Sequence, residues 1–280
     1  MRNFNISLDK SHIYIANSGI ILSDTFDCGQ CFRWNPVEQE KYLGIVNGKV
    51  ITATQAAEGF ILEGEGIEQD VDFWKNYFDL ETDYDAIAKA FEGNEYIFNA
   101  AKAGRGIHIL RQDPWETIVS FIISANNNIT RIKKIIEKLC ELRGTKIVYN
   151  GKVYYSFPTP KQLSSITEQE ISELHAGYRD RYLMTLFKNA NAGFSAEALA
   201  DLDNDGLRKS LLSILGVGNK VCVCIMLFGY NRYSAFPKDV WIKRVIAEHL
   251  GENFSEKDLG EYAGVIQQYL FHYARNLQRS

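Results

Sequence analysis

Two stretches decide the fold: Leu215-Gly216-Val217-Gly218-Asn219-Lys220 and Phe236-Pro237-Lys238-Asp239, whose aspartate lies nineteen residues after the lysine of the first. The first stretch predicts the end of one helix, a glycine turn and the first turn of a second helix, which carries the lysine. The second stretch places an aspartate where it can cap a new helix. Together they predict a helical hairpin that holds an amine near a carboxylate.

The turn around Gly216 and Gly218 is predicted to offer backbone N–H groups to an anion. Leucines at helical spacing precede the turn, and we expect both glycines to adopt positive φ and to allow a close approach of the backbone. Free N–H groups at such a turn and at the start of the next helix can bind a DNA phosphate. A plain αα-hairpin with a glycine turn is the alternative for this motif alone.

Lys220 and Asp239 are the candidate catalytic residues. Lys220 falls in the first turn of a helix, where the positive end of the macrodipole disfavours the ammonium form, and we expect its side chain to be partly buried. A neutral amine is the nucleophile that covalent catalysis at a sugar carbon requires. Asp239 would cap the next helix and, while ionised, stabilise positive charge on a deoxyribose ring. A solvated surface lysine and a purely capping aspartate are the alternatives.

The composition is that of a globular protein. The 280 residues are 46% hydrophobic and 24% charged, which suffices for one large domain or two. No apolar run reaches membrane-spanning length, and the N-terminus lacks the pattern of a signal peptide. We expect a monomer that acts in the cytoplasm, at the nucleoid in a bacterial cell, and does not bind membranes. The net charge of −4 argues mildly against a nucleic-acid partner, so such a partner requires a local basic face.

The five cysteines are predicted to be free thiols. Their number is odd, and no secretion signal precedes them. Cys28 and Cys31 form a single CxxC, without the second pair that a zinc site needs. No group of four cysteines follows Asp239, so we expect no iron–sulfur cluster. The sequence therefore predicts neither a metal nor a cofactor.

The N-terminal third is predicted to form an antiparallel sheet with a helix or two. His12–Ala16 alternates between apolar and polar residues, and residues 60–62 predict a further strand. Residues 42–46 and 49–54 flank Asn47-Gly48, a strong signal for a two-residue hairpin.

Helical periodicity dominates from residue 105 onward. Asp113-Pro114 predicts a helix with a capping aspartate and a proline at its first position. A second helix is predicted over residues 129–142. Asn150-Gly151 then predicts a small hairpin within residues 146–155, after which helices continue to the C-terminus.

Several further motifs lie outside the hairpin. They are Gly29-Gln30-Cys31-Phe32-Arg33-Trp34, Arg111-Gln112-Asp113-Pro114, Ser124-Ala125-Asn126-Asn127-Asn128-Ile129-Thr130-Arg131, Gly177-Tyr178-Arg179-Asp180-Arg181-Tyr182 and Ala263-Gly264 followed by Gln267 and Phe271. With the hairpin and Asp239, this set resembles the 8-oxoguanine DNA glycosylase/AP lyase family of the helix-hairpin-helix GPD superfamily. The likeness extends over nearly the whole chain. The hairpin, lysine and aspartate alone would mark only the superfamily.

The resemblance implies an α+β fold in two parts. Residues 1–104 would form an N-terminal antiparallel sheet domain like half of the TATA-binding protein. Residues 105–280 would form an all-helical catalytic domain that contains the hairpin. A damaged base would enter the cleft between them. The implied function is base-excision repair, in which 8-oxoguanine opposite cytosine is flipped out of duplex DNA and excised.

The resemblance also implies roles for individual residues in the reaction. Lys220 would attack C1′ and form a Schiff base, and Asp239 would assist it, before β-elimination cleaves the abasic site. Cys224 and Phe271 would sandwich the flipped base. Two further groups would read its edges, namely the carbonyl of Gly29 at N7–H and the side chain of Gln267 at the Watson–Crick edge.

Other residues would contact the rest of the duplex. Asn126 would fill the gap left by the flipped base, and Tyr178 would wedge beside its former partner. Arg131 and Arg179 would donate to that partner, which implies cytosine. One departure is Trp241, which stands two residues after Asp239 where animal and fungal relatives commonly have a phosphate-binding histidine.

Three alternatives compete with this interpretation. A helix-hairpin-helix glycosylase for another damaged purine would favour an electron-rich aromatic pocket over the pair Gly29 and Gln267. A non-catalytic DNA-binding module would tolerate the loss of Lys220 and Asp239. The third is a helical protein–protein interaction domain, and a strong salt dependence of duplex binding would count against it.

Overall fold

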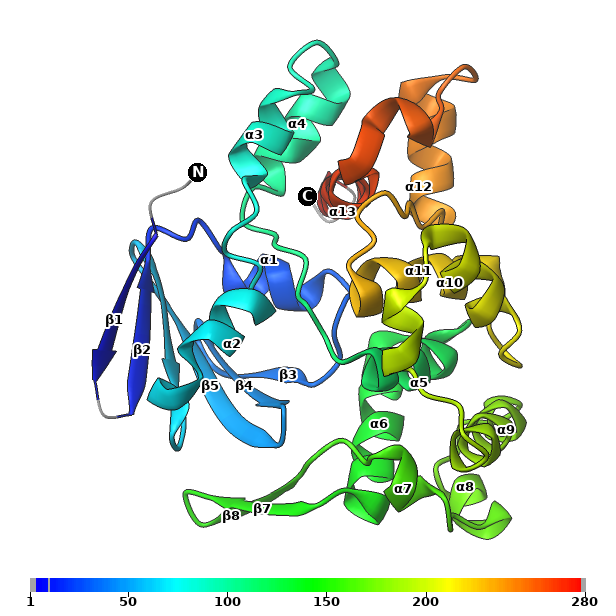
Figure 1. Ribbon diagram of the computed structural model, residues 1–280. Helices are drawn as coiled ribbons and strands as arrows, with labels where there is room; N and C mark the ends of the chain where they lie inside the picture. The colour runs from blue at the N-terminus through cyan, green and yellow to red at the C-terminus, as the bar shows by residue number, and fades with distance from the viewer. Residues whose placement is uncertain (1–3, 10, 278–280) are drawn as a thin grey trace.

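An antiparallel sheet forms the N-terminal part of the chain, and helices form the rest (Figure 1). The computed structural model describes residues 4–9 and 11–277. The sheet has six strands in the order β1-β2-β6-β5-β4-β3. Their bounds are β1 Asn5–Asp9, β2 His12–Ala16, β3 Trp34–Glu38, β4 Lys41–Val46, β5 Lys49–Ala56 and β6 Gly59–Glu63.

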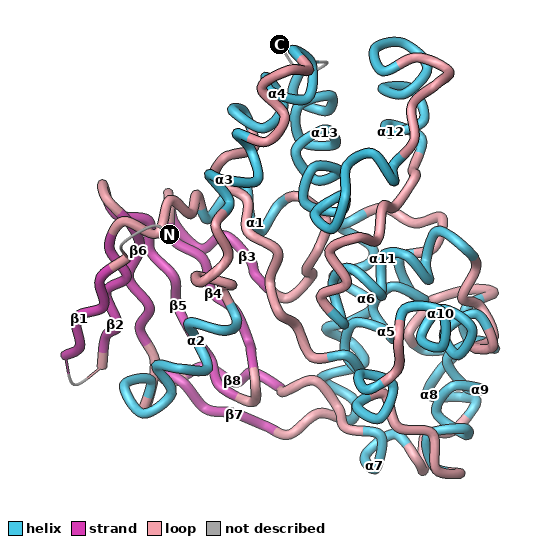
Figure 2. The backbone as a smooth tube through the Cα atoms, turned by 45° about the horizontal axis from the view of Figure 1, so that its top comes forward, coloured by secondary structure: helices cyan, strands magenta, loops and turns pink. Residues whose placement is uncertain are grey.

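Both predicted two-residue hairpins are confirmed. At the turn between β4 and β5, Asn47 and Gly48 have φ of 50° and 72°. Asn150 and Gly151 repeat this geometry between β7 (Lys146–Tyr149) and β8 (Lys152–Tyr155). Positive φ at both central residues matches the right-handed twist of the flanking strands. The second hairpin extends from the helical body to the sheet near β5 (Figures 1 and 2).

Two strands were not predicted from the sequence, and both lie at edges of the sheet. β1 is only five residues long, but its polar and apolar residues alternate from Asn5 to Asp9, so a signal for a strand was present in the sequence. β3 contains Pro36, which cannot donate to a strand ladder and is tolerated only at an edge. The proline explains why the pattern did not indicate β3.

An aromatic core covers one face of the sheet. Trp34 stacks on Phe26 of α1 (Leu22–Asp27), with ring centroids 4.3 Å apart. Its indole N–H donates to the hydroxyl of Tyr77 at the end of α2 (Val71–Tyr77), at 2.8 Å. These two helices therefore anchor the sheet through buried aromatic side chains.

The helical body is built around α11, whose side chains from Cys224 to Tyr230 are buried. Among the described residues, no helix is both long and apolar enough to cross a membrane. The remaining helices are α3 Tyr84–Lys89, α4 Glu95–Ala103, α5 Pro114–Ser124, α6 Ile129–Arg143, α7 Pro160–Leu163, α8 Glu168–Glu173, α9 Arg179–Asn191, α10 Asn204–Leu212, α11 Asn219–Tyr230, α12 Val240–Val245 and α13 Ala263–Leu277. Short 3-10 segments span Ile67–Asp70, Glu197–Asp201 and Glu256–Tyr262, and a π-turn spans Ile246–Leu250.

The sheet and the helices have separate hydrophobic cores. α3 and α4 contribute to the helical core and pack beside α13, although they precede residue 104 (Figure 1). The segment after α4 joins the two cores, because Ile107 and Ile109 belong to the helical core and Leu110 to the sheet core. The α5 and α6 helices begin where the sequence predicts, and Asp113 caps α5 as expected.

Gly44 should be required for the sheet core. It lies opposite Trp34 in the β3–β4 register, and a Cβ built on it would lie 2.5 Å from the indole ring. We expect Gly44→Ala to lower the free energy of unfolding by about 1–3 kcal/mol, because the indole must leave its stacked position. Urea unfolding measures this. Gly93→Ala is the matched control, since a Cβ there meets no atom within 4 Å, and a similar loss in both variants would contradict the prediction.

Candidate active site

One cavity brings together six of the residues predicted from the sequence. It has a volume of about 500 Å³ and lies between the α1–β3 loop and the helical body. The six residues that line it are Gly29, Lys220, Cys224, Asp239, Gln267 and Phe271. They come from four separate segments of the chain.

The glycine turn before α11 differs in one respect from the expectation. Gly216 has a φ of 93°, and a Cβ on it would lie 2.5 Å from the ring of Tyr182. Gly218 has an ordinary φ of −87° and is the N-cap residue of α11, so the prediction of positive φ at both glycines is wrong for Gly218. A Cβ on Gly218 would meet open space, which leaves the backbone accessible from outside.

Lys220 lies in the first turn of α11 and borders the cavity. Its side chain is exposed, so the expected partial burial is not found in the protein alone. Its amine forms no hydrogen bond or ion pair with any described residue. The amine is therefore free to contact a ligand.

Asp239 is held by the helix that it caps. Its Oδ1 accepts a hydrogen bond from the backbone N–H of Ile242 at 2.8 Å, as expected for an N-cap of α12. Its second oxygen accepts from no described residue. One carboxylate oxygen is thus fixed and the other remains available at the cavity. Trp241 also lines the cavity, and the guanidinium of Arg244 lies 5.6 Å from its ring centroid.

Cys224 and Phe271 provide apolar surfaces to the cavity. Cys224 is buried on α11, and burial raises the pKa of its thiol to about 12, although Lys220 acts in the opposite direction. The thiol is therefore neutral at physiological pH. Phe271 on α13 is half-buried, and the guanidinium of Arg275 lies 6.0 Å from its ring centroid. A planar ring in the cavity can contact both the sulfur of Cys224 and the ring of Phe271 favourably.

Gly29 is positioned by its neighbour Gln30, to which the sequence assigned no role. Gly29 has a φ of 83°, which favours glycine, and no atom lies within 4 Å of its would-be Cβ. The buried amide of Gln30 donates to the carbonyls of Thr25 and His108 at 2.9 and 2.8 Å. Its Oε1 accepts from the backbone of Leu110 at 2.9 Å. The sequence signal that could have identified Gln30 was its place in the motif that runs from Gly29 to Trp34.

Lys220 and Arg275 line the cavity together with the carboxylate of Asp239. α6 and α11 both begin at its rim, and helix N-termini carry partial positive charge. Arg131, Lys220 and Lys243 are exposed and form no ion pair with a described residue. Basic side chains that are open to a ligand are therefore present on the elements that form the cavity, although the net charge of the chain is −4.

The four residues predicted to contact the rest of the duplex lie around the loop after α5. Asn126 is exposed with a φ of 50°, and Tyr178 is 54% exposed while its hydroxyl donates to the carbonyl of Ala125 at 3.1 Å. Arg131 is exposed and donates to the carbonyl of His175 at 2.9 Å. Arg179, by contrast, is buried.

The guanidinium of Arg179 donates to three backbone carbonyls. They belong to Ala176 at 3.0 Å, Asn126 at 2.9 Å and Ala125, which its Nε reaches at 2.9 Å. It also lies over the ring of Tyr178, at 4.4 Å from the centroid. Arg179 therefore fixes the loop that presents Asn126.

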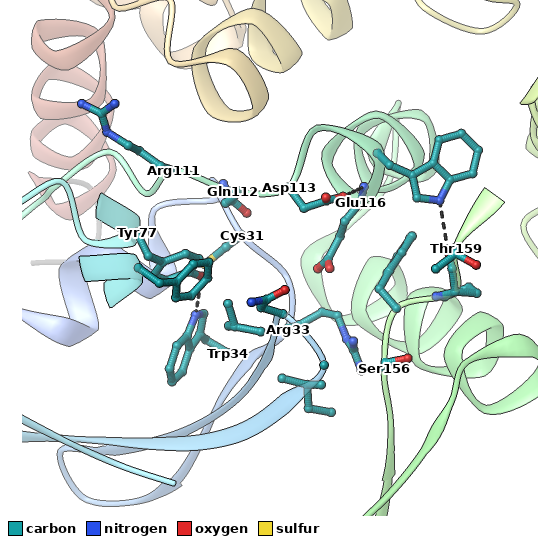
Figure 3. A pocket seen from close by; sticks show the side chains of 18 of the residues that line it. Cys31, Arg33, Trp34, Tyr77, Arg111, Gln112, Asp113, Glu116, Ser156 and Thr159 are labelled. Carbon is teal, nitrogen blue, oxygen red and sulfur yellow. Dashed lines mark hydrogen bonds between the residues drawn. The ribbon is translucent and has the colours of Figure 1, made fainter. Parts of the chain in front are cut away.

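A second cavity of about 540 Å³ lies between the sheet and the N-terminus of α5 (Figure 3). Arg33 borders it, and its guanidinium donates to Glu137 at 3.2 Å and to the carbonyl of Tyr155 at 2.6 Å. The Glu116 side chain enters from α5 near Arg33 (Figure 3). Burial raises the pKa of Glu116 from 4.5 to about 7, while Arg33 acts to lower it. None of the residues predicted for the reaction lines this cavity.

The described residues contain no group of three or more histidine, cysteine, aspartate or glutamate side chains placed to hold a metal ion. Cys28 and Cys31 are both buried free thiols, as are the other three cysteines. The prediction of free thiols is thus confirmed.

Comparison with known families places the chain among DNA repair proteins. The model of the HhH-GPD superfamily base excision DNA repair proteins matches residues 119–259. The model of the 8-oxoguanine DNA glycosylase N-terminal domain matches residues 12–118.

Curated relatives agree with these matches. The N-glycosylase/DNA lyase of Saccharomyces cerevisiae is 32% identical over 267 residues, which cover 82% of this chain and 68% of the yeast protein. The probable N-glycosylase/DNA lyase of Methanothermobacter thermautotrophicus is 30% identical over 227 residues, which cover 71% and 72% of the two chains.

Solved structures extend the likeness to the whole fold. The Clostridium acetobutylicum 8-oxoguanine glycosylase/lyase, in complex with dsDNA containing cytosine opposite to 8-oxoG, superposes with a TM-score of 0.90 at 37% identity, covering 99% of each chain. MBOgg1 in complex with a low affinity DNA ligand gives a TM-score of 0.92 at 35% identity, again over 99% of each chain.

The hairpin, the lysine and the capping aspartate around one cavity define a helix-hairpin-helix enzyme of base-excision repair. Within that superfamily, the chain belongs to the 8-oxoguanine DNA glycosylase family. It is a bifunctional DNA glycosylase/AP lyase.

The two glycines of the turn should respond differently to alanine. We expect Gly216→Ala to lower the free energy of unfolding by about 2 kcal/mol or more, because positive φ and the contact with Tyr182 both disfavour a Cβ. Gly218→Ala should cost about 1 kcal/mol or less, yet weaken duplex binding, since its methyl group would stand in front of the exposed backbone. Urea unfolding and fluorescence anisotropy test this. Equal losses of stability would contradict it.

Glu116 should make the protein less stable as the pH rises from about 4.5 to 7. Below its ordinary pKa of 4.5 both states are protonated, whereas between 4.5 and about 7 only the unfolded state ionises, which favours unfolding. We expect Glu116→Gln to raise the melting temperature at pH 8 and to leave it nearly unchanged at pH 4. The surface variant Glu168→Gln is the control, and a gain independent of pH would refute the argument.

Proposed function

We propose that the protein excises 8-oxoguanine paired with cytosine in duplex DNA through a lysine Schiff base, and then cleaves the abasic site by β-elimination. The observation that carries this proposal is the convergence of Lys220, Asp239, Gly29 and Gln267 on one cavity. The Clostridium structure supports the choice of lesion and partner base, because that relative was solved with the same pair.

The chemistry begins with the free amine of Lys220. Its nitrogen lone pair forms a bond to C1′ as the bond from C1′ to the base breaks, and the base leaves with the bonding electrons and takes up a proton. Opening of the sugar ring then gives a Schiff base between the nitrogen and C1′. Loss of a proton from C2′ expels the 3′ phosphate, which is the β-elimination step.

Asp239 would stabilise the positive charge that develops on the sugar during attack. One of its oxygens is held by the N–H of Ile242, so the carboxylate is pre-oriented. A fixed charge that needs no rearrangement during the reaction is more effective than a mobile one. We expect the neutral amide in Asp239→Asn to keep the cap and lose this stabilisation.

The carbonyl of Gly29 would select the damaged base. N7 of 8-oxoguanine carries a hydrogen that a carbonyl can accept, whereas N7 of guanine is itself an acceptor. Two acceptors that face each other leave both unpaired, which costs roughly 1–3 kcal/mol. A single carbonyl would thus disfavour guanine by roughly one to two orders of magnitude. The flipped base would lie between Cys224 and Phe271, and the side chain of Gln267 would hydrogen-bond its Watson–Crick edge.

The loop after α5 would hold the opposite strand. Asn126 would occupy the space of the extruded nucleotide, with Tyr178 beside the unpaired cytosine and Arg131 and Arg179 as its donors. Extrusion costs a few kcal/mol, and this cost is lower for a damaged or mismatched base. We propose that the protein does this as a monomer beside the chromosome, in the cytoplasm or nucleoid.

Trapping with borohydride tests the proposal. We expect a duplex with one 8-oxoguanine·cytosine pair to give a covalent adduct with the protein, and a guanine·cytosine duplex to give none. Lys220→Gln should abolish the adduct and strand cleavage, because the amide cannot form a Schiff base. Lys188→Gln, an exposed change on α9, is the control. Tight duplex binding without adduct or cleavage in the wild type would refute the lyase mechanism.

A further inference from the structure

The wall of the active-site cavity contains two adjacent glutamines. Gln267 and Gln268 are 3% and 4% exposed, and both line the cavity from α13. The Nε2 of Gln268 donates to the Oε1 of Gln267 at 2.7 Å. Gln268 belongs to no motif identified in the sequence, and a role has been proposed here only for Gln267.

Packing holds the Gln268 side chain in the wall, since it is 4% exposed and makes no other side-chain hydrogen bond with a described residue. Its own Oε1 is buried and accepts no hydrogen bond from a described residue. Buried polar atoms without partners are rare in folded proteins, and each calls for an explanation. A leucine would fill this position without leaving an unpaired oxygen. The one side-chain hydrogen bond that Gln268 makes with a described residue is to the amide of Gln267. This bond indicates that the role of Gln268 concerns the Gln267 amide.

The direction of an amide matters for reading a base. The Watson–Crick edge of guanine presents O6 as an acceptor next to N1–H as a donor. A glutamine amide forms two bonds to this edge only with its Nε2 at O6 and its Oε1 at N1–H. Rotation of the amide by half a turn places donor against donor and acceptor against acceptor, and then matches adenine instead. An amide can rotate in this way unless a neighbour holds it.

We propose that Gln268 is a positioning residue that fixes the direction of the Gln267 amide, and so selects a guanine-type edge over an adenine-type edge in the cavity. This inference rests on the proposed function. The bond from Gln268 identifies the oxygen end of Gln267, and that oxygen has a second lone pair for N1–H. The Nε2 of Gln267 donates to no described residue, so it is free for O6.

8-Oxoadenine is the matched probe for this inference. It shares the N7–H and the 8-oxo group with 8-oxoguanine, so the carbonyl of Gly29 treats the two alike. Its Watson–Crick edge has the opposite order of donor and acceptor. The ratio of single-turnover excision rates for the two bases, each opposite cytosine in the same duplex, therefore reports the direction of the Gln267 amide.

Two variants alter the bond in different ways. Gln268→Met has a similar shape but no donor, so it frees the amide of Gln267 to rotate. We expect the preference for 8-oxoguanine over 8-oxoadenine to fall roughly 10-fold. Gln268→Glu offers only acceptors once it is ionised and then attracts the Nε2 of Gln267, and because burial raises a glutamate pKa the rates are measured as a function of pH. This reverses the amide, so the preference should fall roughly 100-fold.

Cleavage of a preformed abasic site is the internal control. That substrate has no base to read, so all three proteins should cleave it at rates within a factor of about 2 if folding and DNA binding are intact. A wild type that does not excise 8-oxoguanine refutes the proposed function itself. A wild type that excises it, with unchanged base preference in both variants, refutes the role of Gln268 alone. Equal losses on both bases and on the abasic site indicate a structural role and also refute it.

Discussion

The buried side-chain amide of Gln30 holds the two hydrophobic cores in a fixed relation, and the active-site cavity depends on that relation. The amide bonds the carbonyl of Thr25 on the sheet side and both His108 and Leu110 in the segment that joins the cores. The main-chain carbonyl of Gln30 accepts a hydrogen bond from the side-chain amide of Gln112 at 2.8 Å. Because the preceding residue is Gly29, this network positions the carbonyl of Gly29, from the sheet side, at the cavity that Lys220 and Asp239 border from the helical side.

Burial is divided unequally among the groups around the cavity. Cys224 and Gln267 are buried, and burial keeps the Cys224 thiol neutral, whereas Gly29 and Phe271 are partly exposed. Lys220 is exposed and borders the same cavity. Packing within the protein therefore shapes the walls of the cavity, while the amine of Lys220 stays accessible to a ligand.

Sequence patterns predict those parts of the molecule that local chemistry determines. Both Asn-Gly turns, the capped helix after Asp113 and the cap at Asp239 follow from short-range rules, and the structure has them. The edge strand β3 was not predicted, because Pro36 interrupts its local pattern. Gln30, Glu116 and Gln268 could not be assigned roles, because their significance arises from contacts or burial created by distant segments. Exposure of Lys220 was also misjudged, since burial depends on neighbours that no local pattern specifies.

The two arginines expected at the opposite strand are alike in sequence but not in structure. Arg131 is exposed and gives up a single bond to the carbonyl of His175 if it turns toward a base. Arg179 is buried and holds the carbonyls of Ala125, Asn126 and Ala176, which would be left unpaired if it moved. Four of the five N–H groups of the Arg179 guanidinium are engaged in these bonds, so at most one remains for a base while the loop stays in place. Arg179 therefore acts on the conformation of the loop that presents Asn126, whereas Arg131 is the arginine that can turn toward a ligand at little cost.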